Sequence, residues 1–383
     1  MKTFPEQSIL VDSPKEVDVV AIEEELMQLW SHASEVPADG QAAPVIRACS
    51  LNLIVITEDD SQVPPLGDLV GAVTVEHPSR IFLVVADRRS AGPSFEAWVS
   101  SRCFLPAPGE KQVCCEQINL IARGTEGNKI PSLVTSLLVS DVPTVLLWMA
   151  RVSRDDALLR SLVGICDHAL MNSSTERFPQ QAFAAWQELL QGQSGHAAFG
   201  DLAWTQLTGW RTIVAQVFHP IEMRSNLLTL DTVTIEYSSA TAPTHSGLSQ
   251  SLLLAGWLAH RLRWTVIYRL QRAASGEYGA KFRLAEQAVT IRIIPVPVRT
   301  DRPDGIESIT FHTSSGTIVA FQATGSKNFV RVVQEGGGVA RDEMLISLKD
   351  ESEAELVAGE LEVLHRDRPY EETLAALNSL FME

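Results

Sequence analysis

The first 220 residues alternate between apolar runs and segments in which hydrophobic residues recur at helical spacing. Ser13-Pro14-Lys15-Glu16 places a capping hydroxyl, a proline and an acidic residue where a helix begins, and apolar residues follow at helical spacing. A linker rich in Pro, Ala and Gly is expected over 37–44. Further helices are predicted over 65–73 and 130–139, and from Pro179 onward.

Three runs in the same half are apolar at nearly every position, namely 45–57, 81–86 and 145–149. Short runs of this kind are typical of strands that helices cover on both faces. Two further segments, 95–104 and 113–122, alternate between apolar and polar residues as half-covered strands do. The pattern predicts an α/β domain over residues 1–220.

The second half has a different pattern, because short β-branched runs separated by turn residues outnumber helices. A nearly all-apolar helix is expected over 248–262 and two more at the C-terminal end, one capped by Asp350 with Glu353 and one opened by Pro369. The predicted strands are 228–237, 265–270, 281–284, 289–296, 306–312, 317–321, 329–333 and 343–348. Residues 221–383 are therefore predicted to form an α+β domain with a largely antiparallel sheet.

Composition narrows the class of protein. The 383 residues are 45% hydrophobic and 20% charged, as in ordinary globular proteins. The net charge of −16 opposes binding to a phosphate backbone, so a nucleic-acid partner is not expected. The apolar run 142–150 is too short to span a membrane, and the first ten residues lack the pattern of a secretory leader. We therefore expect a cytoplasmic protein with no membrane contact.

The five cysteines are predicted to be buried, reduced thiols. Their number is odd and no Cys-x-x-Cys pair is present, so neither a disulfide framework nor a zinc site is expected. The adjacent Cys114 and Cys115 would point to opposite faces of a strand and could not pair with each other.

Known catalytic and cofactor motifs are missing from the sequence. It has no G-x-G-x-x-G motif after a predicted strand and no G-x-x-x-x-G-K-[ST] motif, the two glycine-rich loops that bind phosphates. It also has no H-E-x-x-H motif, no G-x-S-x-G motif and no paired Cys/His spacing of a metal site. Residues 336–338 are three consecutive glycines between predicted strands, and a hairpin turn explains them better than a nucleotide site. No catalytic residue, cofactor or metal is expected.

Positive charge is concentrated in residues 261–302, whereas both chain ends are acidic. These arginines either form solvated strand faces or make a basic patch for an acidic partner surface or a phosphorylated metabolite. If the patch binds a partner, the candidate contacts are Arg269, Arg272 and Arg283.

Two further clusters carry polar or aromatic chemistry. His77, Ser79 and Arg80 surround Pro78 before a strand; they could bind an anion or could form a proline-set turn with satisfied polar groups. In residues 201–211, Asp201 is placed to cap a short helix. After it come Trp204, Trp210 and Arg211. Tryptophan and arginine are enriched at the hot spots of protein interfaces, but they are also common in the buried core between two domains, and both interpretations are open.

The order and spacing of several short motifs resemble the OpcA family, the glucose-6-phosphate dehydrogenase assembly proteins of cyanobacteria and other bacteria. The resemblance runs from about residue 10 to about residue 310. It rests on the motifs His77-Pro78-Ser79-Arg80, Cys115-Glu116-Gln117-Ile118, Asp141-Val142-Pro143 with Trp148, Asp201-Leu202-Ala203-Trp204-Thr205 with Trp210-Arg211, and Leu252-Leu253-Leu254-Ala255-Gly256-Trp257-Leu258.

The resemblance implies a non-catalytic cytosolic protein that binds glucose-6-phosphate dehydrogenase and promotes its active oligomer. Such a protein would act as an allosteric activator and support the oxidative pentose phosphate pathway. The alternative hypothesis is an enzyme or sensor that binds a sugar phosphate itself through an arginine-rich anion site. A third possibility is a structural interaction protein unrelated to sugar metabolism.

Overall fold

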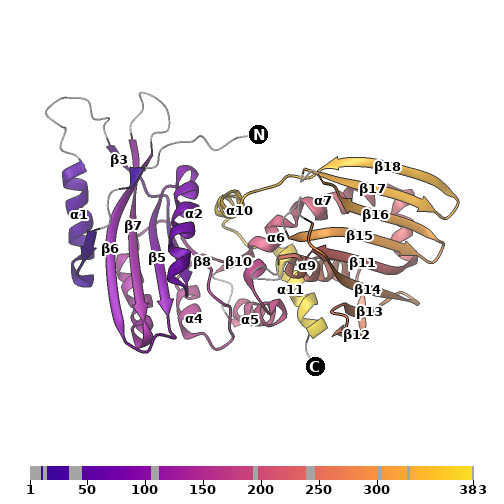
Figure 1. Cartoon of the computed structure of the whole chain (residues 1–383), viewed down its shortest axis with the longest axis horizontal. Coiled ribbons are helices and arrows are strands. Elements are labelled where there is room, and N and C mark those ends of the chain that lie inside the picture. The colour runs from indigo at the N-terminus through magenta and orange to yellow at the C-terminus, as the bar shows by residue number, and fades with distance from the viewer. Residues whose placement is uncertain are drawn as a thin grey trace.

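Two β-sheets and the helices around them make up the computed structural model, which describes residues 10–11, 15–33, 45–104, 112–192, 197–238, 246–299, 304–325 and 328–381. In Figure 1 the first sheet lies on the left and the second on the right, with helices α9 (Ser246–Arg261) and α11 (Arg368–Phe381) between them. None of the described helices has the length and apolarity needed to cross a bilayer.

The first sheet has the order β1-β6-β7-β5-β4-β8-β9-β10, and the short strands β2 and β3 pair with β6 and β7. Strands β7, β5, β4, β8, β9 and β10 run parallel, whereas β6 runs antiparallel at one side. The bounds are β1 Leu10–Val11, β2 Lys15–Val17, β3 Val45–Arg47, β4 Leu51–Thr57, β5 Ser79–Asp87, β6 Ser94–Phe104, β7 Gln112–Arg123, β8 Thr144–Trp148, β9 His168–Met171 and β10 Ala198–Asp201.

Helices cover both faces of this sheet, which explains why its central strands are apolar throughout. Every residue of β4 and of β8 is buried. Helix α2 packs on one face together with α10, and the larger core on the other face includes α1, α3, α4 and α5. The helices of the first half are α1 Ile22–Ala33, α2 Val63–Glu76, α3 Ile130–Leu137, α4 Ala157–Val163, α5 Pro179–Gly192, α6 Leu202–Gln206, α7 Thr208–Val217 and α8 Ile221–Arg224. Single 3₁₀ turns span Val19–Ala21, Asp60–Gln62, Gly124–Lys129, Ser173–Thr175 and Ser225–Thr229.

The second sheet has the order β12-β13-β14-β11-β15-β16-β17-β18, and all neighbours are antiparallel except β11 and β14. The predicted antiparallel sheet is therefore confirmed as a mixed, mostly antiparallel one. Its strands are β11 Leu230–Ser238, β12 Thr265–Arg272, β13 Tyr278–Leu284, β14 Gln287–Val296, β15 Gly305–Thr313, β16 Thr317–Ala323, β17 Phe329–Gly336 and β18 Val339–Ser347.

The glycine run 336–338 forms the hairpin turn between β17 and β18, as predicted. All three residues have positive φ, and a Cβ atom on Gly336 would lie 2.2 Å from the backbone oxygen of Gly316. Glycine is therefore required at this turn by conformation and by space.

The last two helices connect the two sheets. Helix α10 (Glu353–Glu362) packs on α2, and its Leu356, Val357 and Leu361 join the apolar cluster on that face of the first sheet. Helix α11 packs on α9, α5 and β12. The predicted division of the chain near residue 220 stays a prediction, because these contacts cross it.

Three predicted element boundaries were wrong. The first helix begins at Ile22, because Lys15–Val17 pairs as a strand with β6; Ser13, Pro14 and the 37–44 linker lie outside the described residues. The strand predicted over 45–57 is two strands, of which β3 pairs with β7 and β4 with β5 and β8. The cap of α10 is Ser352 with Glu355.

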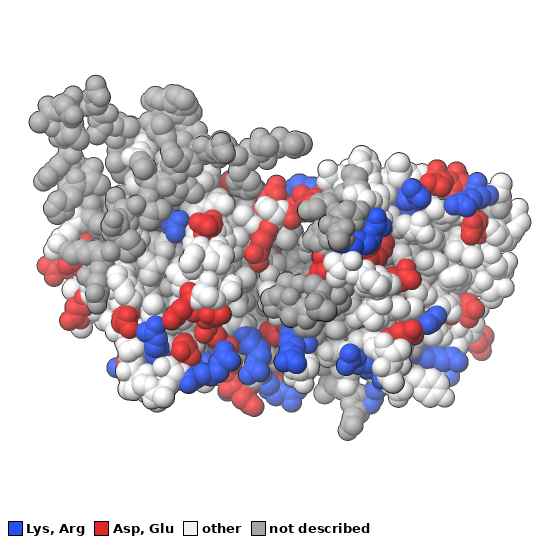
Figure 2. Space-filling view, viewed as in Figure 1, with Lys and Arg blue, Asp and Glu red and all other residues white. Residues whose placement is uncertain are grey.

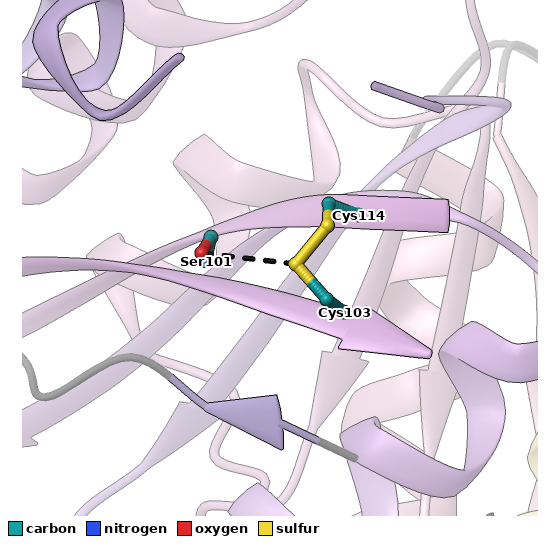
Figure 3. Close-up of a disulfide and its surroundings, with 3 residues drawn as sticks. All are labelled: Ser101, Cys103 and Cys114. Atoms are coloured by element: carbon teal, nitrogen blue, oxygen red, sulfur yellow. Dashed lines mark hydrogen bonds between the residues drawn. A yellow bond between two sulfur atoms is a disulfide. The ribbon is translucent and has the colours of Figure 1, made fainter. Parts of the chain in front are cut away.

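The prediction of reduced cysteines was wrong for one pair. Cys103 on β6 and Cys114 on β7 form a disulfide, because antiparallel pairing places these two residues directly opposite each other. Figure 3 shows the bond crossing between the strands, with Ser101 Oγ 3.9 Å from Cys103 Sγ. Cys115 and Cys166 are free and buried, as expected, and Cys49 is free and partly buried.

Candidate partner interface

The carboxyl edge of a parallel sheet is where doubly wound proteins bind ligands, at the point where the strand order reverses. In this chain that point lies between β4 and β8. Arg88 occupies it, with Nη2 lying 2.6 Å from Glu58 after β4 and Nη1 lying 2.8 Å from Asp156 after β8. Asp156 also caps α4 by accepting from the backbone N–H groups of Leu158 and Leu159. An ion-pair network of Arg88, Glu58 and Asp156 therefore lies at this point of the sheet.

The turn after β4 has the wrong chemistry for a dinucleotide. It carries Glu58, Asp59 and Asp60, and the side chain of Asp59 accepts from the N–H of Ser61. A pyrophosphate at this position would need free N–H groups and glycines, and would be repelled by three carboxylates. The residues present do not fit a nicotinamide cofactor.

Basic side chains gather along the lower edge of the molecule in Figure 2, interspersed with acidic ones. In the same view the carboxyl ends of the first sheet, α4, α5 and β12 all lie along this edge (Figure 1). Arg151 and Arg154 line a cavity of about 450 Å³ beside α5, and Arg154 pairs with Glu188 at 2.6 Å.

The cluster around Arg80 is built into the interior. Arg80 and Glu116 are each about 95% buried, with exposed fractions of 5%, and their Nε and Oε2 atoms lie 2.7 Å apart. Arg80 Nη1 also donates to Glu23 and to the carbonyl oxygen of Leu137, and Ser79 Oγ donates to the carbonyl oxygen of His77. The Nε and Nη1 groups of Arg80 are thus engaged within the chain, and an anion would have to displace a carboxylate to bind at these atoms.

His77 lies apart from Arg80, at the end of α2. A ring nitrogen of His77 lies within 4.8 Å of one carboxylate oxygen of Glu76 and one of Glu362, and the two oxygens are equally close to each other. Among the described residues this is the one group of side chains that could hold a metal ion. Both carboxylates are exposed. Two neighbouring negative charges make His77 a poor place for an anion.

Trp204, Trp210 and Arg211 pack inside the molecule. Trp204 and Trp210 are 2% and 5% exposed, and Trp204 Nε1 donates to Asp367 at 2.7 Å. The guanidinium carbon of Arg211 lies 3.4 Å above the Trp204 ring. Asp201 caps α6 as predicted, by accepting from the N–H of Ala203. These residues join the two sheets, and the tryptophans present almost no surface to a partner.

The predicted basic segment contains an exposed edge strand. Strand β12 pairs with β13 on one side, and no other described strand pairs with its outer side. Arg269 and Arg272 on β12 and Arg283 on β13 are exposed, and Arg272 lies 5.8 Å from the centre of the Tyr278 ring. The three arginines that the sequence singled out therefore lie on the same two strands but are spread along them, because Arg283 pairs with Thr265 at one end of β12 and Arg272 pairs with Tyr278 at the other.

Sequence reasoning missed the apolar part of this edge. Ile267 and Tyr268 are 37% and 64% exposed, and they line a cavity of about 670 Å³ together with Trp264, Arg269 and Ser379 of α11. The sequence pattern predicted a strand over 265–270 but did not show that this strand lies at a sheet edge, where Ile267 and Tyr268 are exposed. Aromatic and arginine side chains side by side are typical of protein interfaces.

Two family models match most of the chain. A model described as the N-terminal domain of the glucose-6-phosphate dehydrogenase subunit matches residues 70–188. A second model, described as the C-terminal domain of the same subunit, matches residues 197–374.

Three curated proteins with the provisional name OxPP cycle protein OpcA are also similar. The protein of Synechococcus elongatus is 28% identical over 332 residues, which are 81% of this chain and 70% of that protein. The proteins of Nostoc punctiforme and Synechocystis are 26% and 24% identical over 75% and 80% of this chain. The chain spans 62% and 64% of their lengths, so both relatives are longer.

Solved structures resemble the chain only loosely. An oxidoreductase domain protein from Kribbella flavida is 10% identical, with 87% of this chain and 96% of that chain covered and a TM-score of 0.47. A likeness at this level carries no argument about activity.

Proposed function

This chain belongs to the OpcA family of glucose-6-phosphate dehydrogenase assembly proteins, and from that premise we propose that it binds glucose-6-phosphate dehydrogenase and raises its activity without catalysing a reaction itself. The observation that carries the proposal is the pair of family models, both described by that enzyme, which together span residues 70–188 and 197–374. Its place would be in the oxidative pentose phosphate pathway.

The geometry of the first sheet supports a non-catalytic role. The crevice in which a dinucleotide would bind holds the contacts of Arg88 with Glu58 and Asp156, and the turn after β4 is acidic. The chain would therefore act through its partner. A binding protein activates an enzyme only by binding the active conformation or oligomer more tightly than the inactive one. A preference of about 1 to 3 kcal/mol shifts that balance roughly five- to 150-fold.

The surface that fits an acidic enzyme best is the edge formed by β12 and β13. It combines the exposed Ile267 and Tyr268 with Arg269, Arg272 and Arg283. The apolar pair would supply contact area and the arginines would pair with carboxylates. A local basic surface matters here because a chain of net charge −16 would otherwise repel an acidic partner.

A nicotinamide-reduction assay tests the proposal. Cognate glucose-6-phosphate dehydrogenase is assayed over a range of concentrations with and without this chain, and the mass of the mixture is determined by light scattering. We expect no rate from the chain alone, a higher rate from the mixture and a new species of larger mass. An unchanged rate and unchanged substrate saturation would reject the proposal.

A further inference from the structure

A cavity of about 670 Å³ lies between α7, the segment from α8 to the following 3₁₀ turn, and α9, with β15 at its base. It is separate from the β12 edge, with which it shares no lining residue. Its volume is in the range of small-molecule sites in proteins.

Positive charge without negative charge marks this cavity. Arg211, Arg224 and Arg261 line it together with His219, and none of the described lining residues is acidic. Arg224 Nη2 donates to the carbonyl oxygen of His219 at 2.8 Å. Arg261 forms no ion pair within the part of the chain that the structure describes. Other exposed arginines of the chain do face a carboxylate, as Arg292 faces Glu277.

Arg211 is the most buried of the three cations. Its Nη2 donates to the carbonyl oxygen of Trp204 and to Thr208 Oγ1, whereas its Nε is buried and has no hydrogen-bond partner among the described residues. Burial lowers the pKa of Arg211 to about 10; Asp367 opposes that shift and the like charge of Arg261 adds to it. Asp367 and Glu360 offset part of the charge of Arg211, whereas Arg224 and Arg261 form no ion pair among the described residues. These two cations and the unused Nε donor of Arg211 favour binding of an anion.

The rest of the lining is apolar and partly aromatic. Trp257 is partly buried at the cavity, and Phe218 and Phe311 pack edge to face at its base with ring centres 5.0 Å apart. Val214, Leu258 and Leu262 complete the apolar wall, and the side chains that could accept a hydrogen bond are the hydroxyls of Thr208 and Thr212 and the imidazole of His219. A ligand rich in hydroxyl groups would lose water here without recovering its hydrogen bonds.

We propose that this cavity binds a small organic phosphate that carries a flat ring, as a nucleoside monophosphate does. The phosphate would lie against Arg224 and Arg261, with Arg211 supplying further charge from the wall, and the ring would stack on Trp257. Guanidinium forks match phosphate oxygens in charge and geometry. This site does not depend on the proposed partner, because it concerns the isolated chain.

Titration calorimetry on the full chain, at low ionic strength, separates the parts of this ligand. The probes are AMP, inorganic phosphate, adenosine and glucose 6-phosphate. We expect AMP to bind at least about tenfold more tightly than phosphate and than glucose 6-phosphate, since ring burial adds to a charge contact that phosphate alone makes. Equal affinity of AMP and phosphate would reject the proposal, because it would leave only a general anion contact.

Matched variants locate the binding. Arg224→Gln with Arg261→Gln removes two exposed cations from the cavity, and we expect AMP affinity to fall by about tenfold or more. Arg269→Gln with Arg272→Gln removes the same charge from the β12 edge and should leave AMP affinity within about twofold. Trp257→Leu should weaken AMP but not phosphate. AMP binding that is unchanged in the first variant, or lost equally in the second, would overturn the assignment.

Discussion

At the scale of single residues, burial raises the pKa of two carboxyl groups, those of Asp201 and Glu176. Asp201 is completely buried; its Oδ1 accepts from the N–H groups of Ser173 and Ala203, while its Oδ2 has no hydrogen-bond partner in the described part of the chain. The pKa of Asp201 is raised to about 6, mainly by burial and to a smaller extent by the negative charge of Glu360. Burial likewise raises the pKa of Glu176 to about 7.

A raised carboxyl pKa makes the fold more stable in acid. The folded chain binds protons more tightly than the unfolded one, so the stabilisation is complete below the unfolded pKa near 4 and is lost as the pH rises through the folded pKa near 6. Asn at position 201 can keep both cap contacts through its side-chain oxygen. We therefore expect Asp201→Asn to lose less stability than wild type between pH 5 and pH 8, by about 1.4 kcal/mol.

Urea unfolding of both proteins at pH 5 and pH 8 measures this difference. The Asp201→Asn variant keeps a residual pH dependence from Glu176, so adding Glu176→Gln to it should flatten the stability profile further. A pH dependence of Asp201→Asn equal to that of wild type would show that Asp201 is ionised in the fold.

Residue chemistry in the sequence identified polar and aromatic clusters but not the residues that surround them in the fold. Arg80 and Trp204 were both singled out, yet their partners Glu116 and Asp367 lie 36 and 163 residues away. Polar groups buried in this way need a partner, and only the folded arrangement of strands and helices decides which residue supplies it. A single sequence does not distinguish an arginine that is ion-paired inside the fold from one that is exposed to solvent.

At the scale of elements, periodicity located most helices and strands but not how strands pair. Strands β4 and β8 were visible because both of their faces are buried. The break between β3 and β4 was missed because a few polar residues within a mainly apolar run do not show where the pairing partner changes. Strand β3 pairs with β7, whereas β4 pairs with β5 and β8. The register of β6 on β7, which places Cys103 opposite Cys114, likewise depends on the loop between them.

The disulfide gives a direct chemical prediction. Peptide mapping without reductant should yield one linked pair, Cys103 with Cys114, and free thiols at Cys49, Cys115 and Cys166. The burial that raises the pKa of Cys115 and Cys166 to about 11 and 12 should make these two slow to alkylate until the chain unfolds. Five alkylated cysteines after unfolding without reductant would contradict the pairing.

Close helix packing gives a second prediction at this scale. A Cβ atom on Gly256 of α9 would lie 2.6 Å from Leu377 Cγ and 3.1 Å from the carbonyl oxygen of Thr373, both on α11. Gly256→Ala should therefore destabilise the chain by about 1 to 3 kcal/mol despite the better helix propensity of alanine. The measurement is the urea midpoint.

Gly359 of α10 is the matched control, because a Cβ atom there would meet nothing within 4 Å. Gly359→Ala should stabilise the chain by up to about 1 kcal/mol, since only helix propensity changes. If both substitutions stabilise the chain, α9 and α11 do not pack as closely as the structure has them.

At the scale of the whole molecule, helices α9, α10 and α11 hold the two sheets together. A partner would therefore meet the charged side chains and the exposed sheet edges on the surface. Helix α10 covers the first sheet and α11 reaches β12 of the second. The arginines of 261–302 were predicted as one basic stretch, but the structure separates them. Arg261 lines the cavity beside α9, whereas Arg269, Arg272 and Arg283 lie on the β12 and β13 edge.

This separation makes partner docking testable by charge reversal. Long-range attraction sets the association rate and its salt dependence, while exposed charges contribute little to folding stability. Reversing Arg269, Arg272 and Arg283 to Glu should slow association with glucose-6-phosphate dehydrogenase by about tenfold at low salt and flatten its dependence on ionic strength. Stopped-flow or surface-based kinetics at two salt concentrations measure both quantities.

The opposite edge of the same sheet provides the control. Arg331 and Arg341 lie on β17 and β18, where each is near Glu343, and they are exposed like the docking candidates. Reversing these two makes the same change in net charge as reversing Arg269 and Arg272 alone, which is the matched pair. Association should slow by no more than about twofold in the control if docking uses the β12 edge. Equal slowing by both variants would mean that only net charge matters. Slowing by the control alone would move the interface to β18, where Met344 and Leu345 are 45% and 62% exposed.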